Sequence, residues 1–298
     1  MNGQTCPIAK IENLLLSTDG SEFSEGAVRE AINLARTCSS RLFALSVVET
    51  NPEYETIAPQ LVEKEIEKAR AYLETVLERA SREQVNCEIG IYQGEDSYRY
   101  IVDEAEKRRA DMIIMGRRGR TGLKRLMMGS VTAKVIGHAP CNVLVVPRAA
   151  KVEMKSILVA SDGSRHSDAA AMEAVSIAKR CGAKLTVMSV VPSESISPFD
   201  IVHSEMQRGL IADKEQKAAE YNIKNIKDMA EKEGIGIEGL IQEGKPYEAI
   251  VNTATEKNID LIVVGSHGRT GLEKLLMGSV TERVIGLAPC AVLIVKAK

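Results

Sequence analysis

Residues 119–146 read GRTGLKRLMMGSVTAKVIGHAPCNVLVV, and residues 268–295 read GRTGLEKLLMGSVTERVIGLAPCAVLIV. Twenty of these 28 positions are identical. A second match lies upstream in the same order, LLLSTDGS at 14–21 against ILVASDGS at 157–164. Self-similarity of this kind indicates a tandem duplication. Because the strand-like run VLVVP ends at residue 147, we expect one domain at 1–150 and a second at 151–298.

Within each half, short apolar runs alternate with longer segments of helical period. The pattern predicts strands at about 11–18, 41–49, 87–93, 111–116 and 142–147, and again at 156–161, 184–191, 236–242, 260–265 and 291–295. Helices are expected at about 21–38, 58–83, 97–109, 130–138 and 199–233. Runs such as DMIIMG and DLIVVG are typical of parallel strands buried on both faces. The predicted fold class is α/β, with two tandem doubly wound domains, each a five-stranded parallel sheet with helices on both faces.

Composition excludes several classes of function. The 39 Lys and Arg residues nearly balance 41 Asp and Glu, and aromatic residues make up only 3% with no Trp. Neither a general nucleic-acid surface nor a base-stacking platform is expected from this composition. With no apolar run long enough for a membrane span and no signal-peptide pattern, we expect no membrane contact and a cytoplasmic location.

The six cysteines contain no C-x-x-C pair. This absence removes the common zinc and thioredoxin-like spacings. Two of them, Cys38 and Cys141, match Cys181 and Cys290 of the other repeat. Equivalent positions in two separate cores favour packing over bridging, so we expect buried, reduced thiols.

The first candidate site is the loop after the fourth strand of each half. It reads Gly-x-x-Gly, then nine residues, then Gly-Ser, with identical spacing in both copies. Glycine lets backbone approach a ligand closely, and Gly-Ser at a helix start offers free N–H groups and the positive dipole end to a phosphate. The alternative is that the glycines only make turns and the serine only caps a helix. Ser279 and Glu282 have the spacing of a capping box, but the residue at that spacing from Ser130 is Ala133. A capping box therefore does not explain Gly-Ser in both copies.

The second candidate is the Asp-Gly-Ser turn that follows the first strand, at Asp19 and again at Asp162. In an open α/β sheet, the first and fourth strands flank the crevice where ligands bind. The aspartate would therefore face the glycine-rich loop, where it could bind a ribose hydroxyl or orient Mg²⁺ on phosphates. An Asp-Gly turn followed by a serine N-cap is the structural alternative.

Other motifs are weaker. The sequence lacks a P-loop and a G-x-G-x-x-G fingerprint, which argues against a P-loop NTPase or a dinucleotide dehydrogenase. His166 and His267 lie near the second site without counterparts in the first half, so no shared histidine base exists. Basic residues crowd the first loop, either as a solvated face or as extra charge for phosphate; they are Arg117, Arg118, Arg120, Lys124 and Arg125, against Arg269 and Lys274 in the second.

The combination of motifs resembles the universal stress protein family, in its tandem two-domain form. The motifs are G-x-x-G-x9-G-S after a D-x-I-[IV]-[MV]-G strand, the upstream [ST]-D-G-S turn and the terminal A-P-C-x-V-L-[IV]-V strand, and they span nearly the whole chain. The resemblance implies a flavodoxin-like fold, similar to adenine nucleotide α-hydrolases, with strand order 3-2-1-4-5. It further implies ATP or AMP in the crevice.

Carried over to this sequence, the resemblance assigns phosphate and ribose to the glycine loop, a position near ribose, phosphate or metal to the aspartate, and adenine to the backbone at the end of the second strand. In the first half the residues are Gly116, Gly119, Gly129, Ser130, Val131, Asp19 and Val47. In the second they are Gly265, Gly268, Gly278, Ser279, Val280, Asp162 and Val190. Arg117-Arg118 replaces the more usual Ser266-His267, so equal affinity of the two sites is in question.

The expected function is that of an ATP-binding regulatory or stress-response protein with slow or no hydrolysis. The halves contain no repeated nucleophile and base, carboxylate dyad or metal cluster, so we expect no catalytic residues and no metal site other than Mg²⁺ carried by the nucleotide. A magnesium-dependent ATP hydrolase or phosphotransferase and a nucleotide-free scaffold are the alternatives. We expect the halves to pair through their apolar final strands at 143–146 and 292–295. A homodimer of tandem chains and a regulatory protein partner of unknown identity are also expected.

Overall fold

The computed structural model describes the chain except for residues 1–5, 9–10, 121–127, 193–204, 270–275 and 298. In the first half the elements are β1 (Asn13–Ser17), α1 (Glu25–Cys38), β2 (Arg41–Glu49), α2 (Pro52–Ile57), α3 (Pro59–Arg82), β3 (Cys87–Gly94), α4 (Ser97–Lys107), β4 (Met112–Gly116), α5 (Ser130–His138) and β5 (Asn142–Val146). In the second half they are β6 (Ser156–Ala160), α6 (Arg165–Cys181), β7 (Lys184–Pro192), α7 (Glu205–Lys232), β8 (Ile237–Gly244), α8 (Pro246–Glu256), β9 (Leu261–Gly265), α9 (Ser279–Leu287) and β10 (Ala291–Val295).

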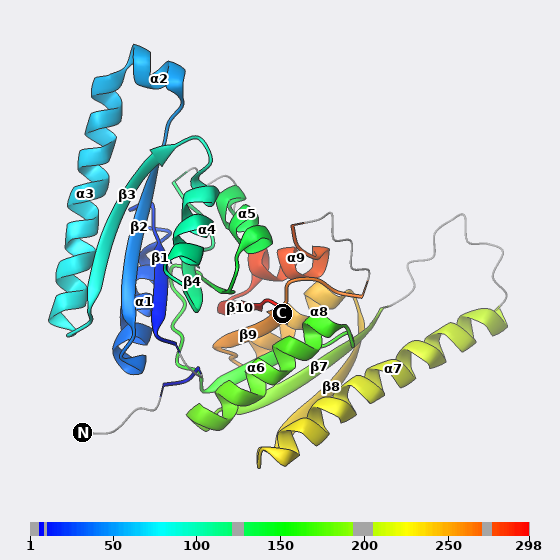
Figure 1. Cartoon of the computed structure of the whole chain (residues 1–298). Coiled ribbons are helices and arrows are strands. Elements are labelled where there is room, and N and C mark those ends of the chain that lie inside the picture. Colours follow the sequence, from blue (N-terminus) through cyan, green and yellow to red (C-terminus); the bar gives the residue numbers. More distant parts are fainter. Residues whose placement is uncertain (1–5, 9–10, 121–127, 193–204, 270–275, 298) are drawn as a thin grey trace.

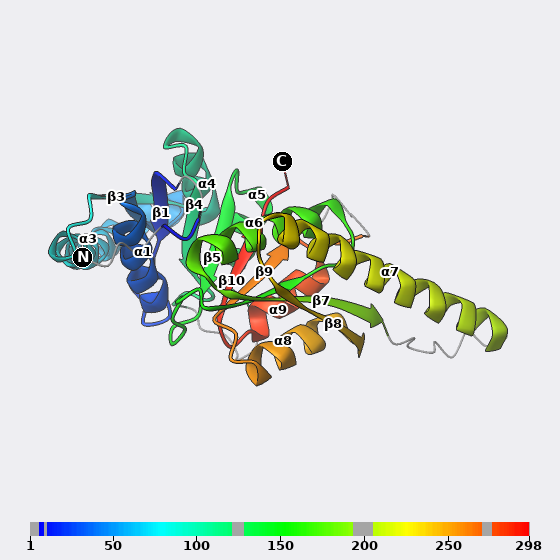
Figure 2. The same ribbon diagram turned by 90° about the horizontal axis from the view of Figure 1, so that it is seen from below.

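The strand order confirms the predicted fold. The strands of the described residues form one 10-stranded sheet in the order β3-β2-β1-β4-β5-β10-β9-β6-β7-β8, which contains the order 3-2-1-4-5 once in each half. Pairs within a half are parallel, whereas β5 and β10 pair antiparallel with Leu144 opposite Leu293. The predicted pairing of the halves through their final strands is therefore confirmed. Figure 1 shows the whole chain, and Figure 2 shows β5 and β10 side by side.

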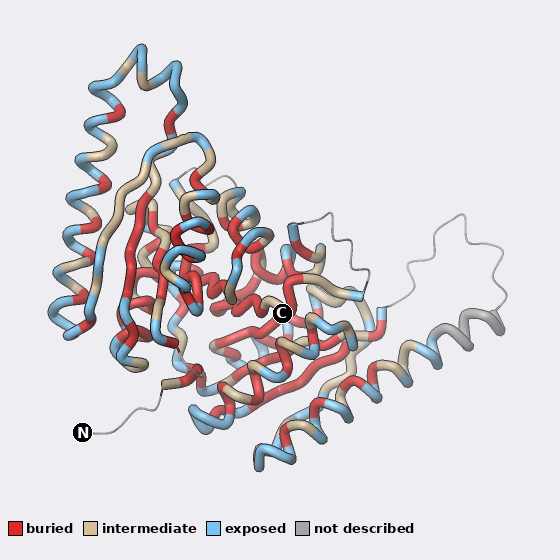
Figure 3. Tube along the Cα trace, in the orientation of Figure 1, coloured by how far each residue is buried: buried red, intermediate tan, exposed pale blue. Residues whose placement is uncertain are grey.

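Helices cover both faces of the sheet because alternate strand residues point to opposite sides. Leu14 and Leu16 of β1 join a core beneath α1, α3, α6 and α7, whereas Leu15 joins a second core beneath α4, α5, α8 and α9. Figure 2 shows the two layers from below, and Figure 3 shows buried residues concentrated along the central strands. No helix in the described part of the chain is long and apolar enough to cross a membrane.

Three helices differ from the sequence prediction. Helix α1 begins at Glu25 and not at about residue 21. Helix α2 was not expected; Pro52 begins it, and the Asn51 side chain caps it by accepting a hydrogen bond from the Tyr54 amide at 2.7 Å. Helix α7 begins at Glu205, and residues 199–204 of the predicted long helix lie outside the described residues.

The prediction that all cysteines are buried, reduced thiols is wrong. Cys6 and Cys38 form a disulfide that joins the N-terminal segment to the end of α1. The counterpart of Cys38 in the second half, Cys181, is free and exposed. The other free cysteines are Cys290, which is buried, and Cys87 and Cys141, which are partly buried. Spacing missed the bond because Cys6 lies outside the repeated part of the sequence.

Candidate functional site

A cavity of about 330 Å³ opens at the carboxyl ends of β1, β2 and β4. Such a position is where open α/β sheets bind ligands. The cavity brings together all of the residues predicted for the first half: Asp19, Val47, Gly116, Gly119, Gly129, Ser130 and Val131. The glycine loop and the aspartate turn therefore share one cavity, as their places after β4 and β1 predict.

The N-terminus of α5 forms one wall of this cavity. Gly129 is the N-cap residue, its amide donates to the Arg117 carbonyl at 2.9 Å, and the Thr132 hydroxyl donates to the Gly116 carbonyl at 3.1 Å. In the second half Gly278 donates to Ser266, and Thr281 to Gly265, both at 2.9 Å. The first amides of each helix have no partner within the helix, which suits an anion.

The serines of the two Gly-Ser pairs are not N-caps. Ser130 and Ser279 are the first helical residues, after Gly129 and Gly278. The alternative in which the serine only caps its helix is therefore wrong, and the Ser279–Glu282 capping box does not form because a glycine occupies the capping position.

Packing is tight around the first two glycines of each loop, where an added Cβ atom would force a neighbour to shift. A Cβ atom on Gly119 would lie 2.7 Å from Asp19 Oδ2, and one on Gly268 would lie 2.7 Å from Asp162 Oδ2. A Cβ atom on Gly265 would lie 2.7 Å from the His166 backbone, and one on Gly116 would lie 3.0 Å from the Phe23 carbonyl. These glycines allow the loop to pack against the β1 and β6 turns.

The third glycine has no such requirement. Gly129 and Gly278 have φ of −67° and −69°, which any residue adopts. Among the described residues, a Cβ atom on either would have no neighbour closer than 3.5 Å, an ordinary contact. The fold therefore leaves room for a side chain at both positions, at the helix end that faces the cavity.

The aspartate is held by the loops around it. Asp19 accepts hydrogen bonds from the Ser21 amide at 3.0 Å, the Ser21 hydroxyl at 2.7 Å and the Arg120 amide at 2.6 Å. Asp162 accepts from the amides of Ser164 at 3.0 Å and Arg269 at 2.9 Å. Each carboxylate thus joins the first turn of its half to the glycine loop.

The same arginines extend this contact to the long helices. The Arg120 guanidinium donates to the Asp19 carbonyl at 2.8 Å and to Glu65 of α3 at 3.0 Å. The Arg269 guanidinium donates to the Asp162 carbonyl and, at 2.8 Å, to Glu215 of α7. Sequence reasoning missed both glutamates, which lie in helices far from the motifs, although the Arg of each GRTG copy was a signal.

The environment of Asp162 favours its charged form. Burial opposes ionisation, but hydrogen bonds from Ser164 and Arg269 outweigh it and lower the pKa of this carboxyl. A carboxylate already bonded in this way remains ionised at neutral pH.

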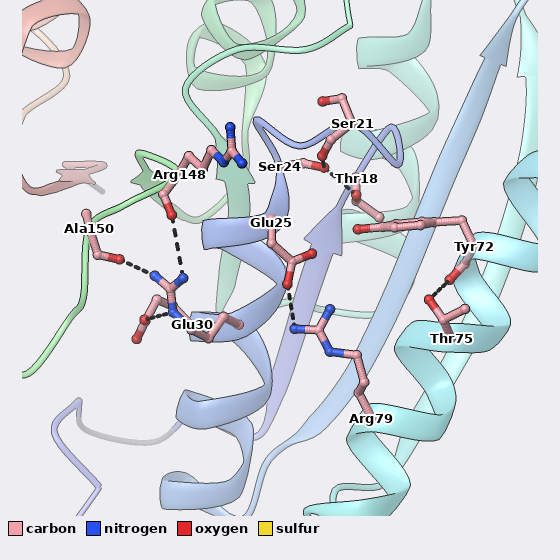
Figure 4. A network of polar contacts seen from close by, with 11 residues as sticks. Thr18, Ser21, Ser24, Glu25, Glu30, Tyr72, Thr75, Arg79, Arg148 and Ala150 are labelled. Carbon is pink, nitrogen blue, oxygen red and sulfur yellow. Dashed lines mark hydrogen bonds and ion pairs between the residues drawn. The ribbon is translucent and has the colours of Figure 1, made fainter.

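Small hydroxyl residues pack beneath the aspartate turn. The Thr18 and Ser24 hydroxyls lie 2.8 Å apart, and the Ser24 hydroxyl donates to the Ser21 carbonyl at 2.9 Å. Figure 4 shows Tyr72 of α3 reaching toward this group. In the second half Ser161 and Ser167 pair in the same way at 3.2 Å. Hydrogen bonds between these hydroxyl groups therefore stabilise the aspartate turn in both halves.

Arg117 fits neither predicted role, a solvated face or a phosphate ligand. It is not among the residues that line the cavity, and its guanidinium donates across the interface between the halves to the Ala288 carbonyl at the end of α9 at 2.9 Å. Burial, with Arg118 close by, lowers its pKa. Arg118 lines the cavity, whereas Lys124, Arg125 and Lys274 lie outside the described residues.

The two histidines of the second half lie together. The rings of His166 and His267 are 5.3 Å apart, and the Ser266 hydroxyl is 3.4 Å from His166 Nδ1 and 3.2 Å from His267 Nδ1. Burial and the neighbouring His267 lower the pKa of His166. Within the described residues, no three His, Cys, Asp or Glu side chains are grouped to hold a metal ion.

Comparison with known proteins identifies relatives of both halves. A model of the universal stress protein family matches residues 10–147 and again residues 153–296. A universal stress protein of Methanocaldococcus jannaschii is 42% identical over 142 residues, which are 48% of this chain and 82% of that protein. The crystal structure of a universal stress protein from Archaeoglobus fulgidus has a TM-score of 0.73 over 97% of this chain and 100% of that one, with 22% identity. The last likeness is one of fold.

Proposed function

Because the chain belongs to the universal stress protein family, we propose that it is an ATP-binding regulatory protein of the stress response, with one nucleotide site in each half. Nucleotide occupancy would set the shape of the chain or its choice of protein partner, and hydrolysis would be slow or absent. Mg²⁺ would arrive with the nucleotide phosphates.

One observation carries this proposal: glycine at 129 and 278 where the fold does not require it. Both residues have ordinary backbone angles and space for a Cβ atom, and both cap a helix that faces the predicted crevice. A ligand that touches the backbone there explains glycine in both copies, and the helix N-terminus suits a phosphate. Glycines that only make turns would not explain it.

The remaining site residues are proposed in roles that fit their positions. Gly129, Ser130 and the amides after them would contact phosphate, and Val47 and Val131 would border the base. Asp19 holds the glycine loop through Arg120 and would contact ribose or the Mg²⁺ of the nucleotide. In the second half the same roles would belong to the corresponding residues Asp162, Val190, Gly278, Ser279 and Val280.

Calorimetric titration of nucleotide-free protein with ATP and Mg²⁺ tests the proposal, and we expect two sites per chain. Gly129→Ala and Gly278→Ala should each weaken their own site by about 10- to 150-fold, because the added methyl group would hold the phosphate away from the first amides of the helix and weaken their hydrogen bonds to it. Loss of the glycine N-cap should lower stability by no more than about 1 kcal/mol. Unchanged binding of two nucleotides by both variants would show that these glycines do not approach a phosphate.

Turnover separates this proposal from the hydrolase alternative. Enzymes commonly turn over at about 1 to 1,000 per second, whereas we expect this chain to release ADP far more slowly. Fast, magnesium-dependent ADP release that disappears in Asp162→Asn would favour the hydrolase.

The domain boundary near residue 150, the cytoplasmic location and the association of two tandem chains belong to the same proposal. The gap between β5 and β6, from Val146 to Ser156, supports the boundary. Limited proteolysis within this gap and sedimentation of the intact chain test the boundary and the association.

A further inference from the structure

The N-terminal segment lies between two equivalent cysteines. Cys38 is the last residue of α1 and Cys181 is the last residue of α6, the corresponding helix of the second half. Cys6 is bonded to Cys38, while its carbonyl oxygen lies 3.5 Å from Nη1 of Arg180, the residue before Cys181. Figure 1 shows this dark blue segment between the ends of α1 and α6. A cysteine outside the repeat is therefore close to the same helix end in both halves.

The segment and Cys181 also border one groove. The groove has a volume of about 1010 Å³, and both Pro7, which follows Cys6, and Cys181 line it. Cys181 is a free thiol on an exposed residue. Cys6 and Cys38 are half-buried, so solvent reaches the region of their disulfide. A thiol and a disulfide that can react with each other thus lie on the same side of the molecule.

Cys6 can change partner without disturbing the sheet. It belongs to no helix or strand, since β1 begins at Asn13. The next buried contact of the segment is Ile8, whose side chain packs in the core beneath α1 and α6. Consecutive Cα atoms are about 3.8 Å apart, so Cys6 can move by several ångströms while Ile8 stays in place. A disulfide requires Cα atoms within about 7 Å of each other, a distance that such a movement can supply.

We propose that Cys181 is a thiol–disulfide exchange site for the bond between Cys6 and Cys38. The Cys181 thiolate attacks Cys6 Sγ, the bond from Cys6 to Cys38 breaks, and Cys38 leaves as a thiolate. The proton of Cys181 passes to solvent and Cys38 takes one up, so one disulfide replaces another without an oxidant or a reductant. The original bond closes a loop within the first half, whereas the new bond joins the first half to the second. This step does not depend on nucleotide binding.

The surroundings of Cys181 set the rate of the exchange, because the attacking species is the thiolate. Although the residue as a whole is exposed, partial burial of its sulfur and the nearby Asp260 carboxylate raise the pKa of the Cys181 thiol, and Arg180 opposes this rise. The thiolate is therefore scarce near pH 7. We expect the exchange to be close to tenfold faster near pH 8, since both pH values lie below the raised pKa.

Disulfide mapping of the whole chain tests the proposal. Oxidised protein with Cys181 as the free thiol is incubated near pH 8 without added thiol, quenched with acid, digested with pepsin and analysed by mass spectrometry. We expect a bond between Cys6 and Cys181 in about a tenth of the chains or more, because both disulfides are intramolecular and similar in kind. Cys38→Ser removes the competing bond, and glutathione disulfide should then join Cys6 to Cys181 in most chains.

Two variants serve as controls. Cys181→Ser should retain the bond between Cys6 and Cys38 without change, and Cys87→Ser, which removes a thiol that does not line the groove, should exchange as the parent does. Thermal unfolding of each variant checks that it is folded.

The proposal is overturned if the parent chain yields no peptide that links Cys6 to Cys181. It is equally overturned if Cys181 of folded Cys38→Ser pairs with glutathione or with a second chain and not with Cys6. Either result would leave the proposed nucleotide binding intact.

Discussion

The two halves agree closely around the aspartate and glycine loops and differ at both ends of the site. Arg120 bridges Asp19 and Glu65 as Arg269 bridges Asp162 and Glu215. Yet Glu49 and Ser97 correspond to prolines, and Phe23 corresponds to His166. The duplicated chain has kept the contacts that join the aspartate turn to the glycine loop, and it has varied residues at the end of β2, at the start of α4 and beside the neighbouring half. Similar loops therefore do not imply identical ligands.

The largest expected difference comes from blocking one site at a time. Gly278→Glu should weaken nucleotide binding in the second half by at least about 100-fold, because a carboxylate and its bulk would occupy the phosphate position. Gly129→Glu should do the same in the first half. Calorimetry should show one site remaining in each variant with affinity within about twofold of the parent. Loss of both sites from a single change would mean that the halves are coupled.

Reduction of the disulfide between Cys6 and Cys38 should lower the stability of the first half and leave that of the second half unchanged. A bond closing a loop of this size, with a sequence separation of 32, contributes about 2 to 4 kcal/mol. Hydrogen exchange should become faster in α1 after reduction or in Cys6→Ser, while α6 is unchanged. Cys181→Ser is the matched control, and identical exchange of α1 in oxidised and reduced protein would contradict the prediction.

Each half supplies a cation to the last turn of a helix in the other, but from different positions. Arg117 donates to Ala288, whereas Lys296 Nζ donates to the carbonyls of Ile136 at 2.9 Å and Gly137 at 3.3 Å. Burial lowers the pKa of Lys296. Arg117→Ala and Lys296→Ala should each lower the free energy of unfolding by about 1 to 2 kcal/mol.

Arg148, whose exposed side chain pairs with Glu22, provides the control for these substitutions. Its change to Ala should alter stability by less than about 1 kcal/mol. If denaturant unfolding gave the same loss for all three variants, the contacts across the interface would have no special contribution.

The smallest expected effect is a pH dependence confined to the second half. The pKa of His166 is lowered by burial and by His267, Arg165 and Lys296, against the opposite effect of Asp162. The fold therefore prefers neutral His166, and stability should fall as the pH drops below the unfolded value of about 6.5.

Substitution by the residue of the first half tests this effect. The melting temperature of His166→Phe should fall less than that of the parent between pH 7.5 and 5.5, by on the order of 2 °C. A difference of the opposite sign would show that protonated His166 is stabilised.

Much of this molecule follows from sequence because its signals are local. The duplication, the alternation of buried strands with helices and the Gly-Ser helix starts predict the strand arrangement and bring Asp19, Gly129 and Val47 to one cavity. The roles of other residues cannot be predicted from the sequence, because they depend on where a side chain points or on a partner far away in the chain. Arg117 lies in a basic run yet points across the interface, and Cys6 meets Cys38 only through the path of the N-terminal segment.

The contact between Glu49 and Ser97 was equally hidden from sequence reasoning. Glu49 and Ser97 belong to no motif, and their contact depends on the end of β2 lying beside the start of α4. Their proline counterparts become informative only when the two halves are compared in three dimensions.

The antiparallel contact between β5 and β10 has a further consequence because one chain supplies both strands. Two separate domains would associate according to their concentration, whereas a short flexible linker gives an effective concentration on the order of millimolar. Dilution should therefore not separate these halves. A signal carried by this protein would act through what binds each half or through their relative orientation, and not through the gain or loss of this pairing.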